Sequence, residues 1–429
     1  MEKNRDYLAE EFAVSVVRRL REAGHEALWA GGCVRDRLLG KQPKDYDVAT
    51  NATPDQVCAV FGARRTLRIG EAFGVVAVLG KKPLEPIEVA TFREEAGYSD
   101  GRHPDQVSFS NAEEDAKRRD FTINGMFYDP IQDRVIDYVQ GQADLQAGTI
   151  RCIGNPLDRF EEDRLRMLRA IRFAATFDFR IDPETLLAIQ KNAQHISVVS
   201  AERISNEMRR MMSHRNICEA MALLQSTGLR AYVMPEFDDS DSNVAAVGRL
   251  WAVALPAWDV GIRTVRRLHD ISFEVTCAAM LGGLADPKEA AKSLARRWKL
   301  ANSERELIVS LVAQESTIRR GDQCDWPRLQ RILIKPFAAK AIEVAAAVAK
   351  TRGESLSGVE FCREKMSLPV KTLNPDPLID GSDLISAGIQ PGPAFRMILD
   401  TVRDQQLNGK LLTAGDALDY ALRMSREET

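Results

Sequence analysis

The spacing of apolar residues predicts one helix at the start of the chain and a mixture of strands and helices after it. Leu8, Phe12, Val16 and Leu20 recur at helical spacing and predict a helix over residues 4–23. Short apolar runs bounded by glycine, proline or polar residues predict strands over 27–30, 45–49, 75–79, 87–91 and 135–139. Helices are predicted over 34–39, 53–60 and 112–127. This mixed order favours one sheet with helices packed on one face.

The pattern changes after about residue 150, where strand-like runs nearly vanish. Helical spacing predicts short helices over 161–177, 183–192, 201–212 and 217–226, and the rest of the chain is predicted to be helical. A turn is expected between residues 227 and 235, a polar loop over 238–243 and a linker over 373–377. We therefore expect an α+β domain followed by an array of helices.

Composition is that of a soluble globular protein. The 429 residues carry 59 Lys and Arg against 62 Asp and Glu, with 45% hydrophobic and 28% charged residues, which excludes disordered, collagen-like and small disulfide-rich classes. The most apolar stretch, 275–285, is much shorter than the ~20 residues of a membrane-spanning helix, so a cytoplasmic protein without membrane contact is expected. Seven widely spaced cysteines give no zinc pattern and no disulfides.

Two motifs in the first domain predict a metal and phosphate site. Gly31-Gly32 ends one predicted strand and opens a helix that carries Arg35, a pattern that can hold a phosphate or serve as a tight turn. Asp45 and Asp47 lie two residues apart on a predicted strand and would face the same way, an arrangement that suits Mg²⁺ or a solvated strand face. Glu88, on another predicted strand, is a candidate third carboxylate.

Three further segments carry candidate chemistry. Residues 98–104 are predicted to form a polar loop. Such a loop either moves over a substrate or is a passive connection. Residues 117–124 are predicted to lie on a helix. Either one of its arginines faces a phosphate or sugar, or the basic residues only pair with nearby acids on the same helix. Residues 159–173 form a predicted helix in which Asp163, Arg166, Arg169 and Arg172 share one side.

An aspartate beside an arginine can distinguish nucleobases. Cytosine and adenine each present an amine donor beside a ring-nitrogen acceptor, whereas uracil and guanine present the opposite polarity. Asp163 and Arg166 would therefore select CTP and ATP, and Arg169 and Arg172 would contact phosphate. The competing interpretation is an amphipathic helix with an exposed arginine stripe.

These motifs resemble those of class II tRNA nucleotidyltransferases, the CCA-adding enzymes, and of their relatives the bacterial poly(A) polymerases. The resemblance rests on residues 31–36 with 45–47, 118–124, 137–145 and 162–166, in that order, and more weakly on 381–413. It implies a polymerase-β-like nucleotidyltransferase head over 1–150, a helical neck over 151–230, a helical body over 231–372 and an RNA-binding tail over 373–429.

The resemblance also implies roles for individual residues. Asp45 and Asp47 would ligate Mg²⁺, Gly32 and Arg35 would meet the triphosphate, and Arg119 would lie near the sugar. Asp163 and Arg166 would read the base, and Arg169 and Arg172 would complete the nucleotide site. The implied reaction is template-independent addition of CCA to tRNA 3′ ends, by attack of the RNA 3′ hydroxyl on the α-phosphate of CTP or ATP with release of pyrophosphate.

Other activities share these motifs. A poly(A) polymerase, an enzyme adding only CC or only the final A, and a non-catalytic RNA-binding protein remain alternatives. The His269-Asp270 pair is too small a set for an HD-type phosphohydrolase. Basic clusters at 263–267 and 296–299 are candidate contacts for the tRNA backbone or ordinary solvated helix faces.

Overall fold

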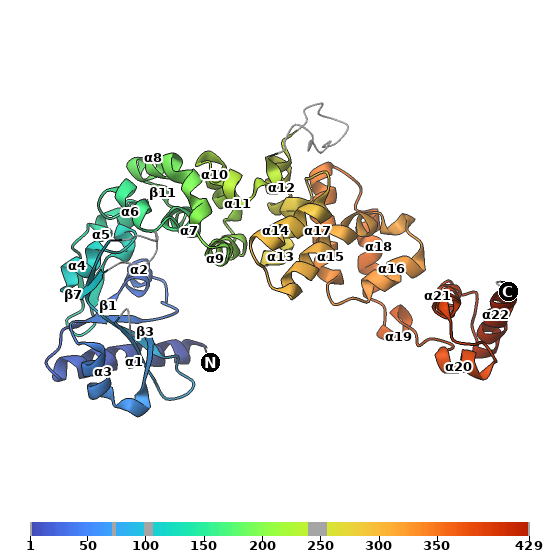
Figure 1. Cartoon of the computed structure of the whole chain (residues 1–429), viewed down its shortest axis with the longest axis horizontal. Helices are drawn as coiled ribbons and strands as arrows, with labels where there is room; N and C mark the ends of the chain where they lie inside the picture. Colours follow the sequence, from blue (N-terminus) through green and yellow to red (C-terminus); the bar gives the residue numbers. More distant parts are fainter. Residues whose placement is uncertain (1, 71–73, 98–105, 239–254, 428–429) are drawn as a thin grey trace. The chain divides into compact units, whose positions relative to one another are not determined.

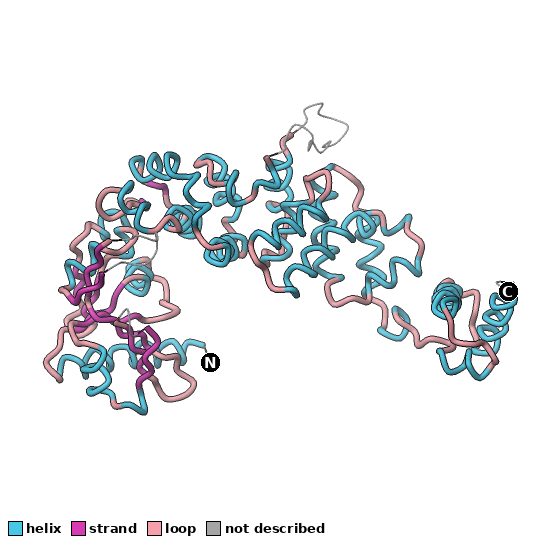
Figure 2. The backbone as a smooth tube through the Cα atoms, in the orientation of Figure 1, coloured by secondary structure: helices cyan, strands magenta, loops and turns pink. Residues whose placement is uncertain are grey.

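The computed structural model describes residues 2–70, 74–97, 106–238 and 255–427. They form two compact units, Met1–Pro235 and Glu236–Thr429 (Figure 1). Every strand among the described residues belongs to the first unit, as the magenta segments of Figure 2 show. All of these strands except β11 lie before residue 151, so the predicted α+β part followed by a helical remainder is confirmed.

A mixed sheet organises the start of the first unit. Its seven strands lie in the order β3-β4-β5-β2-β1-β8-β9, with β2 and β5 parallel and all other neighbours antiparallel. The strands are β1 Ala27–Ala30, β2 Asp47–Thr50, β3 Thr66–Gly70, β4 Val75–Val78, β5 Ile87–Thr91, β8 Phe127–Asp129 and β9 Arg134–Ile136. The parallel β2–β5 pair places the first residues of both strands at one edge of the sheet.

Short elements surround this sheet. Two small pairs are formed by β6 Arg93–Ala96 with β7 Gln106–Phe109 and by β10 Thr149–Ile150 with β11 Arg180–Ile181. The helices are α1 Glu2–Glu22, α2 Gly32–Leu38, α3 Pro54–Phe61, α4 Ala112–Lys117 and α5 Gly141–Gln146, with single 3₁₀ turns at Ala63–Arg65 and Thr122–Asn124.

Helix α1 packs on strands β1 and β2 through one apolar side. Its residues Ala13, Val16, Val17 and Leu20 are fully buried, at the helical spacing that the sequence shows. Trp29 of β1 is 1% exposed, and its ring lies 4.8 Å from that of Tyr46, centroid to centroid. This core fixes the segment between β1 and β2 on which the candidate site depends.

The first unit ends in six helices. They are α6 Pro156–Glu162, α7 Arg166–Phe177, α8 Pro183–Asn192, α9 Ala201–Met212, α10 Ile217–Ser226 and α11 Arg230–Val233. The predicted bounds of α8, α9 and α10 are confirmed. Asp182 caps α8 by accepting a hydrogen bond from the Thr185 N–H at 3.2 Å, and proline occupies its first turn, so this start was readable from the sequence.

The second unit is helical throughout its described part. Its helices are α12 Ala257–Val265, α13 Phe273–Leu281, α14 Pro287–Arg297, α15 Asn302–Arg319, α16 Trp326–Leu333, α17 Ala338–Arg352, α18 Ser357–Met366, α19 Val370–Leu373, α20 Gly381–Ser386, α21 Pro393–Leu407 and α22 Ala414–Glu427. Helix α13 is apolar on nearly all sides and packs among α12, α15 and α17. The last three helices share a small core that includes Leu384, Ile398 and Val402.

Two predicted helices are wrong in extent. The helix predicted over 112–127 ends at Lys117, because Asp120 turns the chain by accepting a hydrogen bond from its neighbour's backbone, Phe121 N–H, at 2.8 Å. The helix predicted over 161–177 is broken at Asp163, whose carboxylate accepts a hydrogen bond from the Leu165 N–H at 3.0 Å. Asp163 therefore precedes α7 instead of lying on it.

Candidate functional site

The turn between β1 and α2 requires its first glycine. Gly31 has φ of 72°, a conformation that residues with a side chain rarely adopt. A Cβ atom at Gly31 would lie 2.9 Å from Nη1 of Arg119. The missing side chain of Gly31 thus makes room for the Arg119 guanidinium, while Gly32 opens α2 and leads to Arg35.

Two candidate carboxylates meet at one edge of the sheet. Asp47 of β2 pairs in register with Glu88 of the parallel strand β5, and both residues are exposed. Cys33 of α2 lies beside them, with its Sγ 3.9 Å from the carbonyl oxygen of Asp47. The prediction that Glu88 lies on a neighbouring strand is confirmed. Asp45, however, lies in an exposed bend before β2, so the predicted strand began too early.

The electrostatics of this edge favour a cation. The pKa of Asp47 is raised to about 6. Although the residue remains accessible at the surface, the protein around its carboxyl replaces part of the surrounding water, and Glu88 and Asp45 add negative charge, against the opposing charge of Arg119. Paired carboxylate oxygens are ligands that suit Mg²⁺, which keeps several waters and takes further ligands from phosphates. No group of three or more His, Cys, Asp or Glu side chains among the described residues is arranged to hold a metal ion. A cation here would therefore take the rest of its ligands from water and substrate.

Arg35 begins a chain of hydrogen bonds that reaches α7. Its Nη1 donates to Oδ1 of Asn124 at 2.6 Å, and Nδ2 of Asn124 donates to Oδ1 of Asp120 at 3.1 Å. The other carboxylate oxygen of Asp120 accepts a hydrogen bond from Nε of Arg169 at 2.8 Å. The Arg35 guanidinium also lies 4.5 Å above the Phe177 ring. Helix α7 is thereby tied to the sheet domain through buried polar groups.

Asp115 holds the two arginines that follow α4. It is 1% exposed and accepts hydrogen bonds from Nε of Arg118 at 2.9 Å and from Nη2 of Arg119 at 2.9 Å. Burial acts to raise the pKa of Asp115, but the charges of Arg119 and Arg118 outweigh it and lower the pKa. Lys117 instead pairs with exposed Glu113 at 2.8 Å. The predicted pairing with nearby acids is therefore confirmed for Lys117, Arg118 and Arg119, of which only Lys117 is exposed.

Asp163 and Arg166 are both engaged by other side chains. Oδ2 of Asp163 accepts a hydrogen bond from Arg203 of α9 at 2.8 Å. Arg166 donates from Nη1 to Glu162 at 2.7 Å and from Nη2 to the carbonyl oxygen of Arg118 at 3.2 Å, with its side chain only 10% exposed. Both groups are held in fixed orientations, and each keeps further hydrogen-bonding capacity for a base edge.

Glu207 of α9 interacts with the remaining two candidate arginines, Arg169 and Arg172. Its Oε2 accepts a hydrogen bond from Nε of Arg172 at 2.5 Å, and its Oε1 lies 3.9 Å from Nη1 of Arg169. Glu207 is 4% exposed, yet it lies on the apolar stripe of its helix with Ile204, Met208 and Met211. An acid on an apolar stripe was the sequence signal that could have identified this residue.

The structure therefore brings the predicted site residues into two groups. One group contains Gly32, Asp45, Asp47 and Glu88 at the sheet edge. The other contains Arg35, Arg119, Asp163, Arg166, Arg169 and Arg172, each held by a polar or charged side chain. The charge of Arg119 acts on Asp47 and links the two. Sequence reasoning missed Arg203 and Glu207, and the predicted substrate-covering loop over 98–104 lies outside the described residues.

Basic residues of the second unit differ in how they are paired. Arg296 pairs with Glu289 at 3.2 Å, and Arg297 pairs with Glu236 at 3.3 Å. Arg263, Arg266 and Arg267 instead line a hollow with Thr351. Asp270 of the His269-Asp270 pair has a structural contact. It accepts a hydrogen bond from the Ser272 N–H at 2.9 Å, at the start of α13.

Two further features bear on the predicted class. No described helix combines the length and apolar character needed to cross a membrane. Each of the seven cysteines carries a free thiol.

Comparisons with known proteins cover nearly the whole chain. Residues 27–151 match the family model of the poly(A) polymerase head domain, 178–240 that of the RNA- and SrmB-binding site of polymerase A, and 274–421 that of tRNA nucleotidyltransferase domain 2. A CCA-adding enzyme of Levilactobacillus brevis is 32% identical over 97% of this chain and 99% of its own length. A CCA-adding enzyme of Limosilactobacillus reuteri is 34% identical over 94% of this chain and 93% of its own length.

A solved structure shares the fold along the full length. The CCA-adding enzyme of Bacillus stearothermophilus in complex with CTP superposes with a TM-score of 0.77, at 27% identity, and the match covers 97% of each chain. The sequence relatives and this structure agree with one another on the family.

Proposed function

The chain belongs to the CCA-adding enzymes, and we propose from this premise that it adds C, C and A to the 3′ end of tRNA, using CTP and ATP, in the cytoplasm. The predicted family and the polymerase-β-like head followed by helices are confirmed. The assignment of individual residues, the metal and the tRNA contacts is our proposal.

The register of β2 and β5 carries the proposal. Asp47 and Glu88 stand side by side where β1 ends in the Gly31 turn, so a cation, a phosphate and an attacking hydroxyl can meet at one edge. Asp45 adds negative charge beside them. Bound Mg²⁺ would supply the positive charge that stabilises the attacking and leaving oxygens of phosphoryl transfer. Asp45 and Asp47 would hold it, with Glu88 beside them.

The chain's own residues would orient the nucleotide. Arg35 and Arg119 border the sheet edge and are positioned by Asn124 and Asp115, so their charges are fixed before substrate arrives. The RNA 3′ hydroxyl would attack the α-phosphate, and pyrophosphate would leave toward these arginines. Gly32 would let the backbone approach the triphosphate closely.

Selection of cytosine and adenine would depend on the start of α7. Asp163 would accept from the exocyclic amine, and Arg166 would donate to the ring nitrogen. Arg169 and Arg172 would complete the nucleotide site on this helix, and Asp120 and Glu207 would hold their guanidinium groups in place. Arg263, Arg266 and Arg267, which line one hollow of the second unit and form no ion pair with a described residue, are candidates for contacts with the tRNA backbone.

The deciding experiment uses purified protein, Mg²⁺ and tRNA ending at the discriminator base. Products formed with CTP, ATP or both are then sequenced. Addition of C, C and A followed by arrest is expected. Long adenosine runs would identify a poly(A) polymerase, and CC alone or A alone would identify a partial enzyme. No incorporation would favour a non-catalytic RNA-binding protein.

A variant separates the metal site from RNA binding. Asp47→Ala should reduce incorporation by about 10³-fold, because the cation it holds is worth several kcal/mol in the transition state. Binding of tRNA should stay unchanged. Asp55→Ala is a matched control, because Asp55 lies on helix α3, is 83% exposed and pairs with Arg68 at the surface. Full turnover by Asp47→Ala would refute the assignment.

A further inference from the structure

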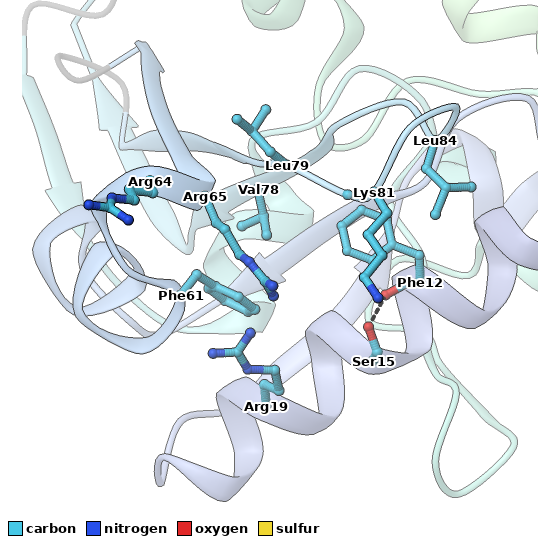
Figure 3. Close-up of a pocket in the computed structure, with 11 residues that line it drawn as sticks. Phe12, Ser15, Arg19, Phe61, Arg64, Arg65, Val78, Leu79, Lys81 and Leu84 are labelled. Carbon is cyan, nitrogen blue, oxygen red and sulfur yellow. Dashed lines mark hydrogen bonds between the residues drawn. The ribbon is translucent and has the colours of Figure 1, made fainter.

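A pocket of 460 Å³ lies on the first unit away from the candidate site (Figure 3). It is enclosed by α1, the end of α3, the 3₁₀ turn Ala63–Arg65 and the loop that follows β4. This volume falls within the range of about 300–1,000 Å³ in which proteins bind small molecules.

The sheet separates this pocket from the candidate site. In the antiparallel β4–β5 pair, Val78 stands opposite Ile87 and Ala77 opposite Glu88. Paired residues point to the same face, and consecutive residues point to opposite faces. Val78 lines the pocket, so Glu88 and its neighbour Asp47 face the other side of the sheet. A ligand in the pocket would not contact the carboxylate edge.

The pocket has an apolar floor. Phe12, Phe61, Val78, Leu79 and Leu84 supply it, with Phe61 and Val78 buried and the others half-buried. Phe12 is the half-buried aromatic ring against which a planar ring can pack, whereas Phe61 is buried beneath the Arg19 guanidinium.

Four cations border this floor. They are Arg19, Arg64, Arg65 and Lys81. Figure 3 shows the ends of Arg19 and Arg65 on either side of the Phe61 ring, with Lys81 on the opposite side of the pocket and Arg64 directed away. Arg19 is fixed in place, since its Nη2 donates to the Val60 carbonyl at 2.6 Å and its guanidinium lies 4.5 Å above the Phe61 ring.

No acid among the described residues pairs with the arginines and the lysine of this pocket. The described residues that line the pocket include no Asp or Glu, and Arg65 and Lys81 form no ion pair with any described residue. Like charges directed at one small space repel one another unless an anion lies between them. An aromatic floor bordered by unpaired guanidinium and ammonium groups matches a ligand with a planar ring and a phosphate.

We propose that this pocket is a second nucleotide site, which binds a free nucleoside phosphate with its base on the Phe12 and Phe61 side and its phosphate among Arg19, Arg65 and Lys81. The site lies beyond the proposed function, because the carboxylate edge and the arginines of α7 take no part in it. A nucleotide within an RNA chain also carries a planar base and a phosphate. The experiment therefore distinguishes binding of a free nucleotide from binding of RNA.

Binding to the full-length protein is measured by calorimetry without Mg²⁺, with guanosine 5′-monophosphate as the probe. Guanine presents the polarity that the proposed Asp163 and Arg166 pair rejects, so this probe favours the pocket over the candidate site. The double variant Arg65→Gln, Lys81→Gln should weaken binding by about tenfold or more, because two charge-assisted contacts are lost. Ser15→Trp, which fills the floor from α1, should also abolish binding.

Controls test each part of the proposal. Arg18→Gln, an exposed neighbour of Arg19 outside the pocket, should leave binding unchanged. Inorganic phosphate should bind more weakly than the nucleotide, and CCA addition by the double variant should match that of the unmodified protein.

Several results would overturn the proposal. They are absence of binding to the unmodified protein, equal affinity in the double variant, and phosphate binding as tightly as the nucleotide. Weaker tRNA binding by the double variant, without any nucleotide binding to the unmodified protein, would assign the cations to the RNA backbone instead.

Discussion

Asp120 and Arg169 join the sheet domain to the helix that carries the candidate base-selecting residues. Nε of Arg169 donates to Oδ2 of Asp120 at 2.8 Å, across 49 positions of sequence. Asp120 is 9% exposed, and its other oxygen accepts hydrogen bonds from Asn124 and from the Phe121 N–H. Because Asn124 also binds Arg35, one buried carboxylate positions groups on both sides of the site.

Asp120→Asn should destabilise the first unit by about 2 kcal/mol. Removing one partner of a buried ion pair costs ~3–5 kcal/mol, and the cost is smaller here because the Arg169 side chain is 30% exposed. Urea unfolding followed by a probe in the first unit measures the change. Asp178→Asn is the control, since Asp178 is an exposed left-handed residue that asparagine replaces without strain. Equal stability of the two variants would contradict the prediction.

The same pair predicts how stability depends on pH. Burial acts to raise the pKa of Asp120, but Arg169 and the hydrogen bonds from Asn124 and Phe121 outweigh it and hold the pKa well below its ordinary value. A carboxyl with a lowered folded-state pKa stabilises the protein above its unfolded pKa of about 4 and loses that contribution as pH falls. The unfolding free energy should therefore decline below about pH 4, and less steeply in Asp120→Asn. Parallel curves of unfolding free energy against pH for the unmodified protein and Asp120→Asn would contradict this prediction.

Local patterns predicted much of this fold. Strands β1 and β5 and helices α8 to α10 have the predicted bounds. Apolar positions alternate along β5, and α8 to α10 carry helical apolar spacing, with a capping Asp182 and a proline at the start of α8. Asp47 and Glu88 were both identified from residue chemistry, but their pairing across β2 and β5 is a matter of sheet register, which no local pattern contains.

Failures occurred where side chains compete with helical hydrogen bonds. The segments that include Asp120 and Asp163 contain good helix-forming residues, yet each aspartate accepts a backbone hydrogen bond that ends or interrupts the helix. Pairs such as Arg203 with Asp163 span 40 positions, so they become visible only when α9 packs against α7.

Arg203 should influence which nucleotide is selected. It holds one oxygen of Asp163, so Arg203→Ala would leave that carboxylate fixed only by the Leu165 N–H and would weaken recognition of the base amine. We expect discrimination of CTP over UTP and of ATP over GTP to fall by about tenfold, the scale of one good hydrogen-bonded base contact. Ratios of kcat/KM on tRNA substrates measure it.

The control for Arg203 lies on the same helix. Arg210→Ala removes an exposed α9 cation and should leave the kcat/KM ratios unchanged. Stability should change by less than about 1 kcal/mol in Arg203→Ala, because the ion pair it breaks is partly exposed. An unchanged ratio in a folded Arg203→Ala protein would exclude Asp163 as a reader of the base.

Gly31 and Gly40 allow the position of Arg119 to be tested separately from backbone strain. Both have positive φ, 72° and 67°, so alanine should cost each about 1 kcal/mol of stability. A Cβ at Gly31 would lie 2.9 Å from Nη1 of Arg119, whereas nothing lies within 4 Å of one at Gly40. Gly31→Ala should therefore displace the guanidinium and raise KM for CTP by about tenfold, the loss expected for one charged contact. Gly40→Ala should share the loss of stability and keep the original KM, so equal KM values in the two variants would show that Arg119 does not meet the nucleotide.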